Sequence, residues 1–341
     1  MLEVVAGVRD FFRFGPAQAD HLSAARIAVG VAVPLVVVML LGRTDLAVYA
    51  AFGSFTGIYA RRETLRRRFV HQSVAGLVIL ACLALGMLVA DAAGVSGVTI
   101  VLIGSVVAAL GAVLAAGIGL KPSGSVFFVF AFTSIAGLPS PPPAAQGLGV
   151  ALGTIAFCVF LGYLARVLPG MGEGAPILGG SFSAAQLTWH GSQFLIVALM
   201  AGVIGQLSGV GHSNWAMVAG IAAIAAPDAP ARVGRAIHRV VGTLAGVAVS
   251  AVILGLRLGA WALALVIIVL QFLGELFVVR HYATALLFIT PLALCMVQLS
   301  NPMPVGQLVV SRAVETVIGA AVAVVVVVLL EPAVARVRNR A

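Results

Sequence analysis

The chain has 341 residues, of which 62% are hydrophobic and 9% are charged, and its mean hydropathy is +1.16. Soluble globular domains usually carry about 25% charged residues, so this composition excludes a water-soluble protein and indicates an integral membrane protein. The net charge of +9 does not indicate nucleic-acid binding, because the basic residues lie in short connections between apolar segments. Cys82, Cys158 and Cys295 lie inside apolar segments without metal or redox spacing and are interpreted as small core residues.

About twelve apolar segments are candidate membrane-spanning helices, six in each half of the chain. Residues 1–21 precede them as a cytoplasmic segment that either lies on the membrane surface as a short helix or lacks structure. The segments are 22–42, 45–60, 69–90, 95–118, 125–138, 144–167, 191–208, 213–226, 238–256, 258–279, 282–300 and 306–330. Those at 45–60, 125–138, 191–208 and 213–226 are short for a bilayer that needs about 20 residues. We therefore expect neighbouring helices to shield them, the helices to extend into the connections, or some helices to be broken.

The order of features predicts an all-α membrane protein built as two parallel six-helix repeats. Each half contains a turn, a short segment of small residues and then a basic connection, and six spans per half relate the halves by an axis along the membrane normal. A Gly/Pro-rich linker joins them. The predicted parts are the first repeat at 22–167, the linker at 168–190, the second repeat at 191–331 and a basic tail at 332–341.

The basic residues support this number of spans. With both termini on the cytoplasmic side, 16 of the 20 Lys and Arg residues fall in cytoplasmic segments, 2 fall in outside connections, and 2 fall inside spans. Cytoplasmic connections of membrane proteins carry an excess of Lys and Arg. We therefore predict a multi-pass protein of the bacterial inner membrane with both termini in the cytoplasm.

The strongest concentration of positive charge is PDAPARVGRAIHRVVGTLAG, residues 227–246. Arg235, Arg239, Gly242 and Gly246 follow a four–three–four spacing, which places them on one stripe of a helix. Because the two glycines permit close helix packing, the arginines would face a helix interface or the interior rather than lipid. Two interpretations remain open: the arginines orient the protein and contact phospholipid, or they form a vestibule for anions.

Three further charged residues fall inside predicted spans. Arg312 and Glu315 are three residues apart and therefore adjacent on one helix. Because buried charge is costly in a membrane, the pair marks either a substrate or proton pathway or a structural salt bridge. Arg26 lies near the inner end of the first span, where it either faces the pathway or extends to the interface.

Several titratable side chains lie near predicted helix ends. Glu275 is a candidate proton carrier, with pairing to Arg280 at the rim as the favoured alternative. His71 and His238 lie at corresponding inner ends, where they either couple transport to pH or anchor at the interface. Trp215 is expected at the outer headgroups.

The sequence contains no recognisable enzyme signature. No His, Cys, Asp or Glu cluster has metal-ligand spacing, and GIGLKPSGS at 117–125 does not follow the order of a phosphate loop. We therefore predict no enzymatic activity, no metal site and no cofactor. Uphill transport by such a protein would need an ion gradient.

Two motifs of the second half, R-x-x-G-T-x-x-G and R-x-x-E-T-x-x-G, resemble those of the fusaric acid resistance proteins and aromatic acid exporters. The plant aluminium-activated malate transporters are similar at greater distance. The resemblance covers the second half well and the first half weakly, and many relatives carry a large cytoplasmic domain for which this chain has only a short segment between its halves. The motif residues are Arg239, Gly242, Thr243 and Gly246, followed by Arg312, Glu315, Thr316 and Gly319.

The resemblance implies export of organic or aromatic carboxylic acids coupled to the proton gradient, and formation of a homodimer. Arg235 and Arg239 would gather a small organic anion from the cytoplasm, and Arg312, held by Glu315, would be a second station toward the exit. The lipid bilayer is the other expected partner. Two alternatives stay open: a passive organic-anion channel, and a membrane scaffold or stress protein that transports nothing.

Overall fold

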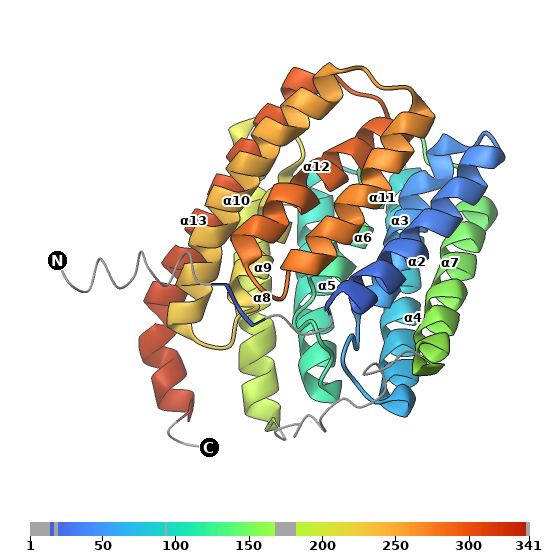
Figure 1. The fold of residues 1–341 in the computed structure, drawn as a ribbon. Helices are drawn as coiled ribbons and strands as arrows, with labels where there is room; N and C mark the ends of the chain where they lie inside the picture. The colour runs from blue at the N-terminus through green and yellow to red at the C-terminus, as the bar shows by residue number, and fades with distance from the viewer. Residues whose placement is uncertain (1–13, 17–19, 93, 168–181, 339–341) are drawn as a thin grey trace.

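The computed structural model describes residues 14–16, 20–92, 94–167 and 182–338, with side chains up to residue 330. Twelve α-helices and three short 3-10 helices form this part of the chain, in which no strand is found (Figure 1). The α-helices are α2 (Asp20–Leu40), α3 (Ala47–Ser54), α4 (Leu65–Asp91), α5 (Gly97–Ile118), α6 (Val126–Ala136), α7 (Ala144–Leu164), α8 (Ala184–Ser208), α9 (Ser213–Ile224), α10 (Ala229–Gly255), α11 (Ala260–Phe277), α12 (Tyr282–Ser300) and α13 (Val305–Arg338). The 3-10 helices are η1 (Thr44–Leu46), η2 (Phe55–Ile58) and η3 (Ala165–Val167).

Each predicted apolar segment corresponds to one helix, but three of these helices are too short to cross a bilayer alone. Over the described ranges, nine helices are long and apolar enough to span a membrane. The exceptions are α3, α6 and α9, with 8, 11 and 12 residues. The prediction of about twelve transmembrane helices is therefore confirmed in part: the described residues form nine long helices and three short ones, which fall in the segments at 45–60, 125–138 and 213–226.

Several helix ends also differ from the predicted boundaries. The segment predicted at 191–208 is not short, because α8 begins seven residues earlier and has 25 residues, with Ser183 and Gln186 forming a capping box at its start. α13 continues to Arg338, so most of the predicted tail is helical. The predicted surface helix within 1–21 and most of the predicted linker lie outside the described residues.

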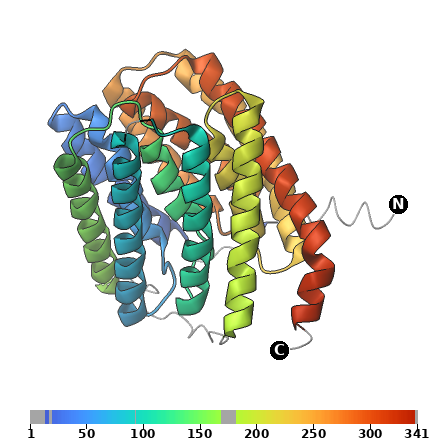
Figure 2. The same cartoon turned by 180° about the vertical axis from the view of Figure 1, so that it is seen from behind.

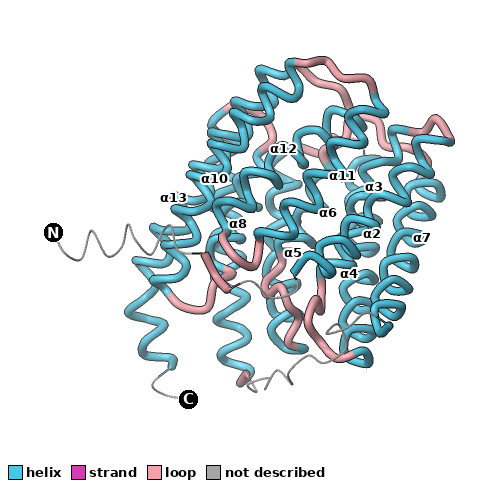
Figure 3. The backbone as a smooth tube through the Cα atoms, in the orientation of Figure 1, coloured by secondary structure: helices cyan, strands magenta, loops and turns pink. Residues whose placement is uncertain are grey.

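The short helices lie inside a layer of long ones. α10, α12, α11 and α2 pack side by side across one face (Figure 1), and α7, α4, α5, α8 and α13 form the opposite face (Figure 2). The connections between helices gather toward the two ends of the bundle (Figure 3). α9 contacts α6, α8, α10 and α13, and its residues 215–224 are all buried. Protein therefore surrounds the short helices, which is the condition under which a helix can end at membrane depth.

Backbone carbonyl groups at the end of the first short helix accept hydrogen bonds from long helices. Arg26 Nη2 on α2 donates to the Gly57 carbonyl at 3.0 Å. Gln72 Nε2 on α4 donates to the carbonyl of Tyr59, the residue directly after η2, at 3.1 Å. The last carbonyl groups of a helix have no partner within the helix, so these side chains supply the missing donors.

The end of α9 is satisfied in the same way from α10. Arg235 Nε donates to the Ala222 carbonyl at 2.8 Å, and Arg232 Nε donates to the Ala226 carbonyl at 3.0 Å. A cation is also favourable at a helix C-terminus, where the carbonyl dipoles point outward. Part of the positive charge at 227–246 therefore has a structural role that the sequence interpretation did not include.

Glycines set the closest helix contacts of the second half. Gly242 and Gly246 on α10 lie against α12, and a Cβ atom at Gly246 would come within 2.7 Å of both the Leu286 carbonyl oxygen and Thr290 Cβ. Gly319 on α13 lies against α9 in the same manner. These contacts bring the arginine-bearing stripe of α10 against the first turn of α12.

Replacement of Gly246 by Leu tests this packing. We expect Gly246→Leu to lower the melting temperature of the detergent-purified protein, because overpacking a tight contact costs about 1–3 kcal/mol. Gly153→Leu on α7 is the matched control, since a Cβ atom there meets nothing within 4 Å. Equal melting temperatures for the two variants would contradict the close α10–α12 contact.

Candidate anion site

Three arginines converge around the first turn of α12. Arg239 Nη1 donates to the Tyr282 hydroxyl at 2.8 Å. The guanidinium carbon of Arg235 lies 4.1 Å from the centre of the Tyr282 ring. Arg312 comes from α13, with its guanidinium carbon 5.3 Å from the centre of the Trp215 ring, close enough to Arg239 and Tyr282 for their charges to interact. We call Arg235, Arg239 and Arg312 the arginine cluster.

Two members of the arginine cluster are buried and Arg235 is half-buried, and none of the three has an acidic partner among the described residues. Arg239 and Arg312 are 4% and 3% exposed. The Arg239 Nε, Arg312 Nε and Arg312 Nη1 atoms are buried without a hydrogen-bond partner. None of the ion pairs between described residues involves Arg235, Arg239 or Arg312. Because an uncompensated charge in a low-dielectric interior is costly, this arrangement favours an anion from outside the chain.

Glu315 does not supply that negative charge. Its Oε1 atom accepts a hydrogen bond from Ser208 on α8 at 3.3 Å, and its Oε2 atom is buried without a partner. No ion pair joins Glu315 to Arg312 in the described part of α13. The prediction that Glu315 holds Arg312 is therefore wrong: the two side chains start one turn apart but contact different helices.

Trp215 is part of the site rather than a headgroup anchor. The side chain is buried, with 2% exposure, and it lies beside Arg312. The His212 ring stacks on Trp215 with 4.6 Å between the ring centres. Burial lowers the pKa of His212 below its ordinary value, so this ring is neutral at pH 7 and adds no positive charge. Trp215 therefore packs against Arg312 inside the protein and does not present its ring to the surface, as a headgroup anchor would.

A second group of charged side chains lies between the two halves. Arg26 is 7% exposed and bonded to backbone, so it does not extend to the interface. Glu275 is 5% exposed and pairs with Arg61, while Gln271 Nε2 donates to its Oε1 atom at 3.2 Å. The predicted rim pairing of Glu275 with Arg280 is therefore wrong.

Arg280 instead pairs with Asp20. Arg280 Nε donates to Asp20 Oδ2 at 2.9 Å, and Arg62 pairs with the other oxygen of the same carboxylate. Asp20 thus joins the first residue of α2 to the connection between α11 and α12. Sequence inspection gave no role to Asp20, because its partners are 42 and 260 residues away.

The two candidate histidines are not brought together. His71 Nδ1 lies 2.6 Å from Glu63 Oε2. The His238 ring lies 4.9 Å from the ring of His281, and Phe14 stacks on that ring at 4.7 Å. His238 is thus the histidine nearer to the arginine cluster, one residue before Arg239 on α10.

Sequence reasoning missed two residues of the sites. Tyr282 connects the arginines of α10 to α12, and its signal was its position at the helix start directly after the basic pair Arg280 and His281. Arg61 was interpreted only as part of a basic connection. Its distinguishing feature is burial, which charge counting along the sequence does not reveal.

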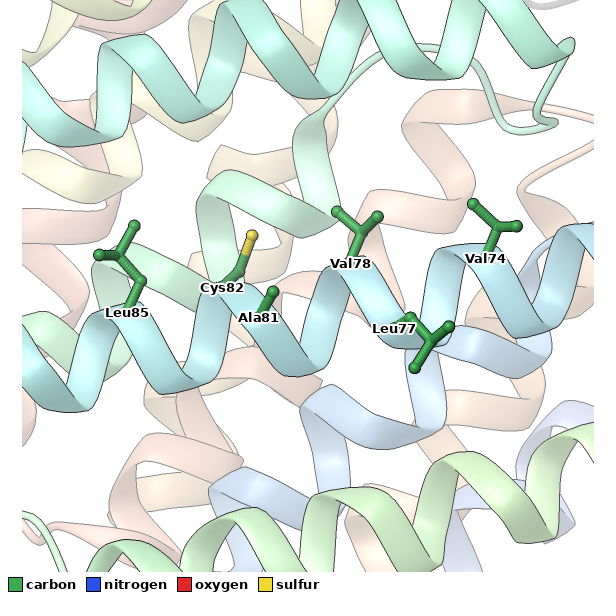
Figure 4. A pocket seen from close by; sticks show the side chains of 6 residues that line it. All are labelled: Val74, Leu77, Val78, Ala81, Cys82 and Leu85. Atoms are coloured by element: carbon green, nitrogen blue, oxygen red, sulfur yellow. The ribbon is translucent and has the colours of Figure 1, made fainter.

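Two grooves on the outer surface have a different character. Both run along α4 and have apolar linings, the second shared with α7. Figure 4 shows Val74, Leu77, Val78, Ala81, Cys82 and Leu85 along the first one. Such linings suit lipid chains and offer no donor to an anion, so the arginine cluster remains the candidate site.

The fold and composition define an α-helical, multi-pass membrane protein. Residues 199–326 match the family described as fusaric acid resistance protein-like. This match confirms the resemblance noted for the second half, and it extends from α8 to α13 and includes all three residues of the arginine cluster. Searches of curated proteins and of solved structures gave no match.

The uncompensated charge predicts an unusual stability effect. We expect Arg312→Gln to raise the melting temperature of the purified protein by roughly 2–4 °C, because it removes a buried charge that has no partner. Arg68→Gln should have the opposite effect, since Arg68 donates to the carbonyl oxygens of Ala60, Glu63 and Gly162. A lower melting temperature for Arg312→Gln would indicate that Arg312 is a structural residue.

Proposed function

We propose that this protein is a secondary transporter that exports organic or aromatic carboxylic acids across the bacterial inner membrane. The observation that supports this proposal most directly is the arginine cluster, in which Arg239 and Arg312 are buried and no member has an acidic partner in the described part of the chain. The match to the fusaric acid resistance protein-like family supports a membrane transport role, and its name indicates a pyridine carboxylic acid as one solute to test.

The chemistry of guanidinium groups favours a carboxylate ligand. Their planar fork of N–H donors matches the two oxygens of a carboxylate, and the pairing is strong where water is scarce. Arg239 and Arg312 both retain unused donors. Arg235 lies nearer the start of α10, so its charge would attract the anion toward them.

We further propose that the protein consists of two parallel repeats with both termini in the cytoplasm. Corresponding helices make corresponding contacts: α4 packs on α6 and α7 as α10 packs on α12 and α13, and α2 packs on α3 as α8 packs on α9. The halves also meet at two matching seams, α5 against α8 and α11 against α2. The excess of basic residues in alternate connections supports the orientation.

A proton gradient is the proposed energy source. Glu275, His71 and His238 are the candidate proton carriers, and Glu275 has the strongest claim because it is a buried carboxylate in contact with a cation. An inside-negative membrane potential would also favour the outward movement of an anion. A homodimer remains part of the proposal on family grounds alone.

Export assays with single-residue variants test this function. In everted membrane vesicles or proteoliposomes, we expect the protein to move fusaric acid or benzoate, and Arg239→Ala and Arg312→Ala to reduce the rate at least about tenfold, the effect of losing one charge-assisted hydrogen bond of about 1.5–3 kcal/mol. Arg166→Ala is the control, because Arg166 lies exposed on the surface beside Tyr163.

The same assay separates the alternatives. Transport that stops when a protonophore is added supports a proton-coupled carrier, whereas a current that follows voltage and ignores the pH gradient would make the protein a passive anion channel. Unchanged transport by Arg312→Ala at normal expression would overturn the site. A protein that moves none of a panel of aromatic and aliphatic acids would be a scaffold rather than a transporter.

A further inference from the structure

The seam between α2 and α11 contains a second buried cationic site, and a glutamate of the chain occupies it. Arg61 Nη2 donates to the Glu275 carboxylate and, at 3.0 Å, to the Glu275 backbone carbonyl. Arg26 has an electrostatic interaction with the same carboxylate. Arg26 and Glu275 are 7% and 5% exposed, and the Arg61 side chain is 10% exposed. The site therefore lies inside the protein, where the halves meet.

Positive charge exceeds negative charge at this site. Arg61 and Arg26 both interact electrostatically with the carboxylate of Glu275, while the Glu63 carboxylate, on the same connection as Arg61, pairs with His71. One nitrogen of Arg26 is occupied by a backbone carbonyl. The Arg61 Nε and Nη1 atoms and the Arg26 Nε atom are buried without partners. Glu275 thus occupies only part of the donor set, and the remaining donors suit a second carboxylate.

We propose that Arg61 and Arg26 form a second anion-binding station, and that the carboxylate of Glu275 fills this station until protonation of Glu275 releases Arg61 to the carboxylate of the transported acid. The proposal rests on the proposed transport function. It assigns carboxylate anions as the ligands of the second station, and it assigns competition with an internal carboxylate as the form of regulation.

The competition follows from the geometry of the guanidinium group. With Nη2 of Arg61 held by Glu275, an incoming carboxylate can use Nε or Nη1 but cannot form the paired contact that makes arginine a strong carboxylate ligand. A proton taken from water by the Glu275 carboxylate makes that side chain neutral. Gln271 still donates to its Oε1 atom, so the neutral acid keeps a partner while Nη2 becomes available.

Few other titratable groups face Glu275. α2 supplies Arg26, and its Asp20 is engaged by Arg62 and Arg280. α12, the other helix packed on α11, places Ile289 against the neighbouring Gly274. His281, before α12, bonds to Thr284 and stacks on Phe14. Among the side chains the structure describes around this seam, Glu275 is therefore the acid that controls access to Arg61 and Arg26.

The other seam between the halves has no such site. Where α5 meets α8, Gly191 lies against Val113 and Ala109, with 2.7 Å between a Cβ atom built at Gly191 and Val113 Cγ2. The helices there are closely packed through apolar and small residues. The charged seam between α2 and α11 is thus a specific feature of the chain rather than a general property of the contact between halves.

Binding of radiolabelled benzoate to purified protein carrying Arg312→Gln tests the proposal. This background disables the arginine cluster, so the signal comes from the second station, and benzoate stays ionised throughout the range used. We expect the affinity to fall at least about tenfold between about pH 5 and about pH 8, as the buried carboxyl loses its proton. Adding Glu275→Gln, which imitates the protonated acid, should remove the pH dependence of the affinity and keep the affinity for benzoate high across the whole pH range.

A matched control and a second variant make the result decisive. Glu63→Gln changes another buried carboxylate, the partner of His71, and should leave the pH dependence unchanged. Arg61→Gln should lose the acid-enhanced affinity, and it tests the proposal even if Glu275→Gln does not fold. The second station would be overturned by a benzoate affinity that still depends on pH in Glu275→Gln or in Arg61→Gln. It would also be overturned if the Arg312→Gln protein, in which Glu275 is intact, bound benzoate with the same affinity at every pH.

Failure of this inference is distinguishable from failure of the proposed function. If the protein without substitutions exports benzoate but the station has no Glu275-dependent affinity, the transport function stands and the second station does not. If the protein without substitutions moves and binds no carboxylate at any pH, both proposals are wrong.

Discussion

The constraint on which the structure depends is that every helix end inside a membrane needs hydrogen-bond partners. Three helices end within this bundle, and arginines on the neighbouring long helices supply donors to two of those ends. Arg26 donates to the end of the first short helix, and Arg232 and Arg235 donate to the end of α9. The fold therefore requires guanidinium groups at the depth where a transported anion would need them.

The two groups of interior arginines differ in how their charge is balanced. Around Tyr282 there is no acid among the described partners, whereas at the α2–α11 seam Glu275 pairs with Arg61 and interacts electrostatically with Arg26. Under the proposals above, the first group would bind an anion whenever it is unoccupied, and the second would bind one only when Glu275 is protonated. If the halves are repeats, their sites have diverged, since one lacks an internal acid and the other contains Glu275.

Much of the fold, and one element of the site, could be predicted from local pattern. The spacing of Arg239, Gly242 and Gly246 correctly predicted that Arg239 lies inside the protein, because glycines at that spacing indicate a closely packed neighbouring helix. The pairing of Arg312 with Glu315 failed because adjacency along a helix does not decide which neighbour each side chain contacts; Glu315 meets α8. The contacts of Tyr282, Arg61 and Asp20 were not predictable, since their partners lie 42 to 260 residues away in the sequence.

The distribution of unused donors separates structural arginines from functional ones. Arg68 and Arg235 direct their N–H groups at backbone carbonyls, so the fold itself accounts for them. Arg239, Arg312 and Arg61 keep buried N–H groups that no described residue accepts, a cost that a purely structural side chain would not need to retain. Such local conflicts concentrate at functional sites, and the unused donors of these three arginines support the proposal that they bind a negatively charged group from solution.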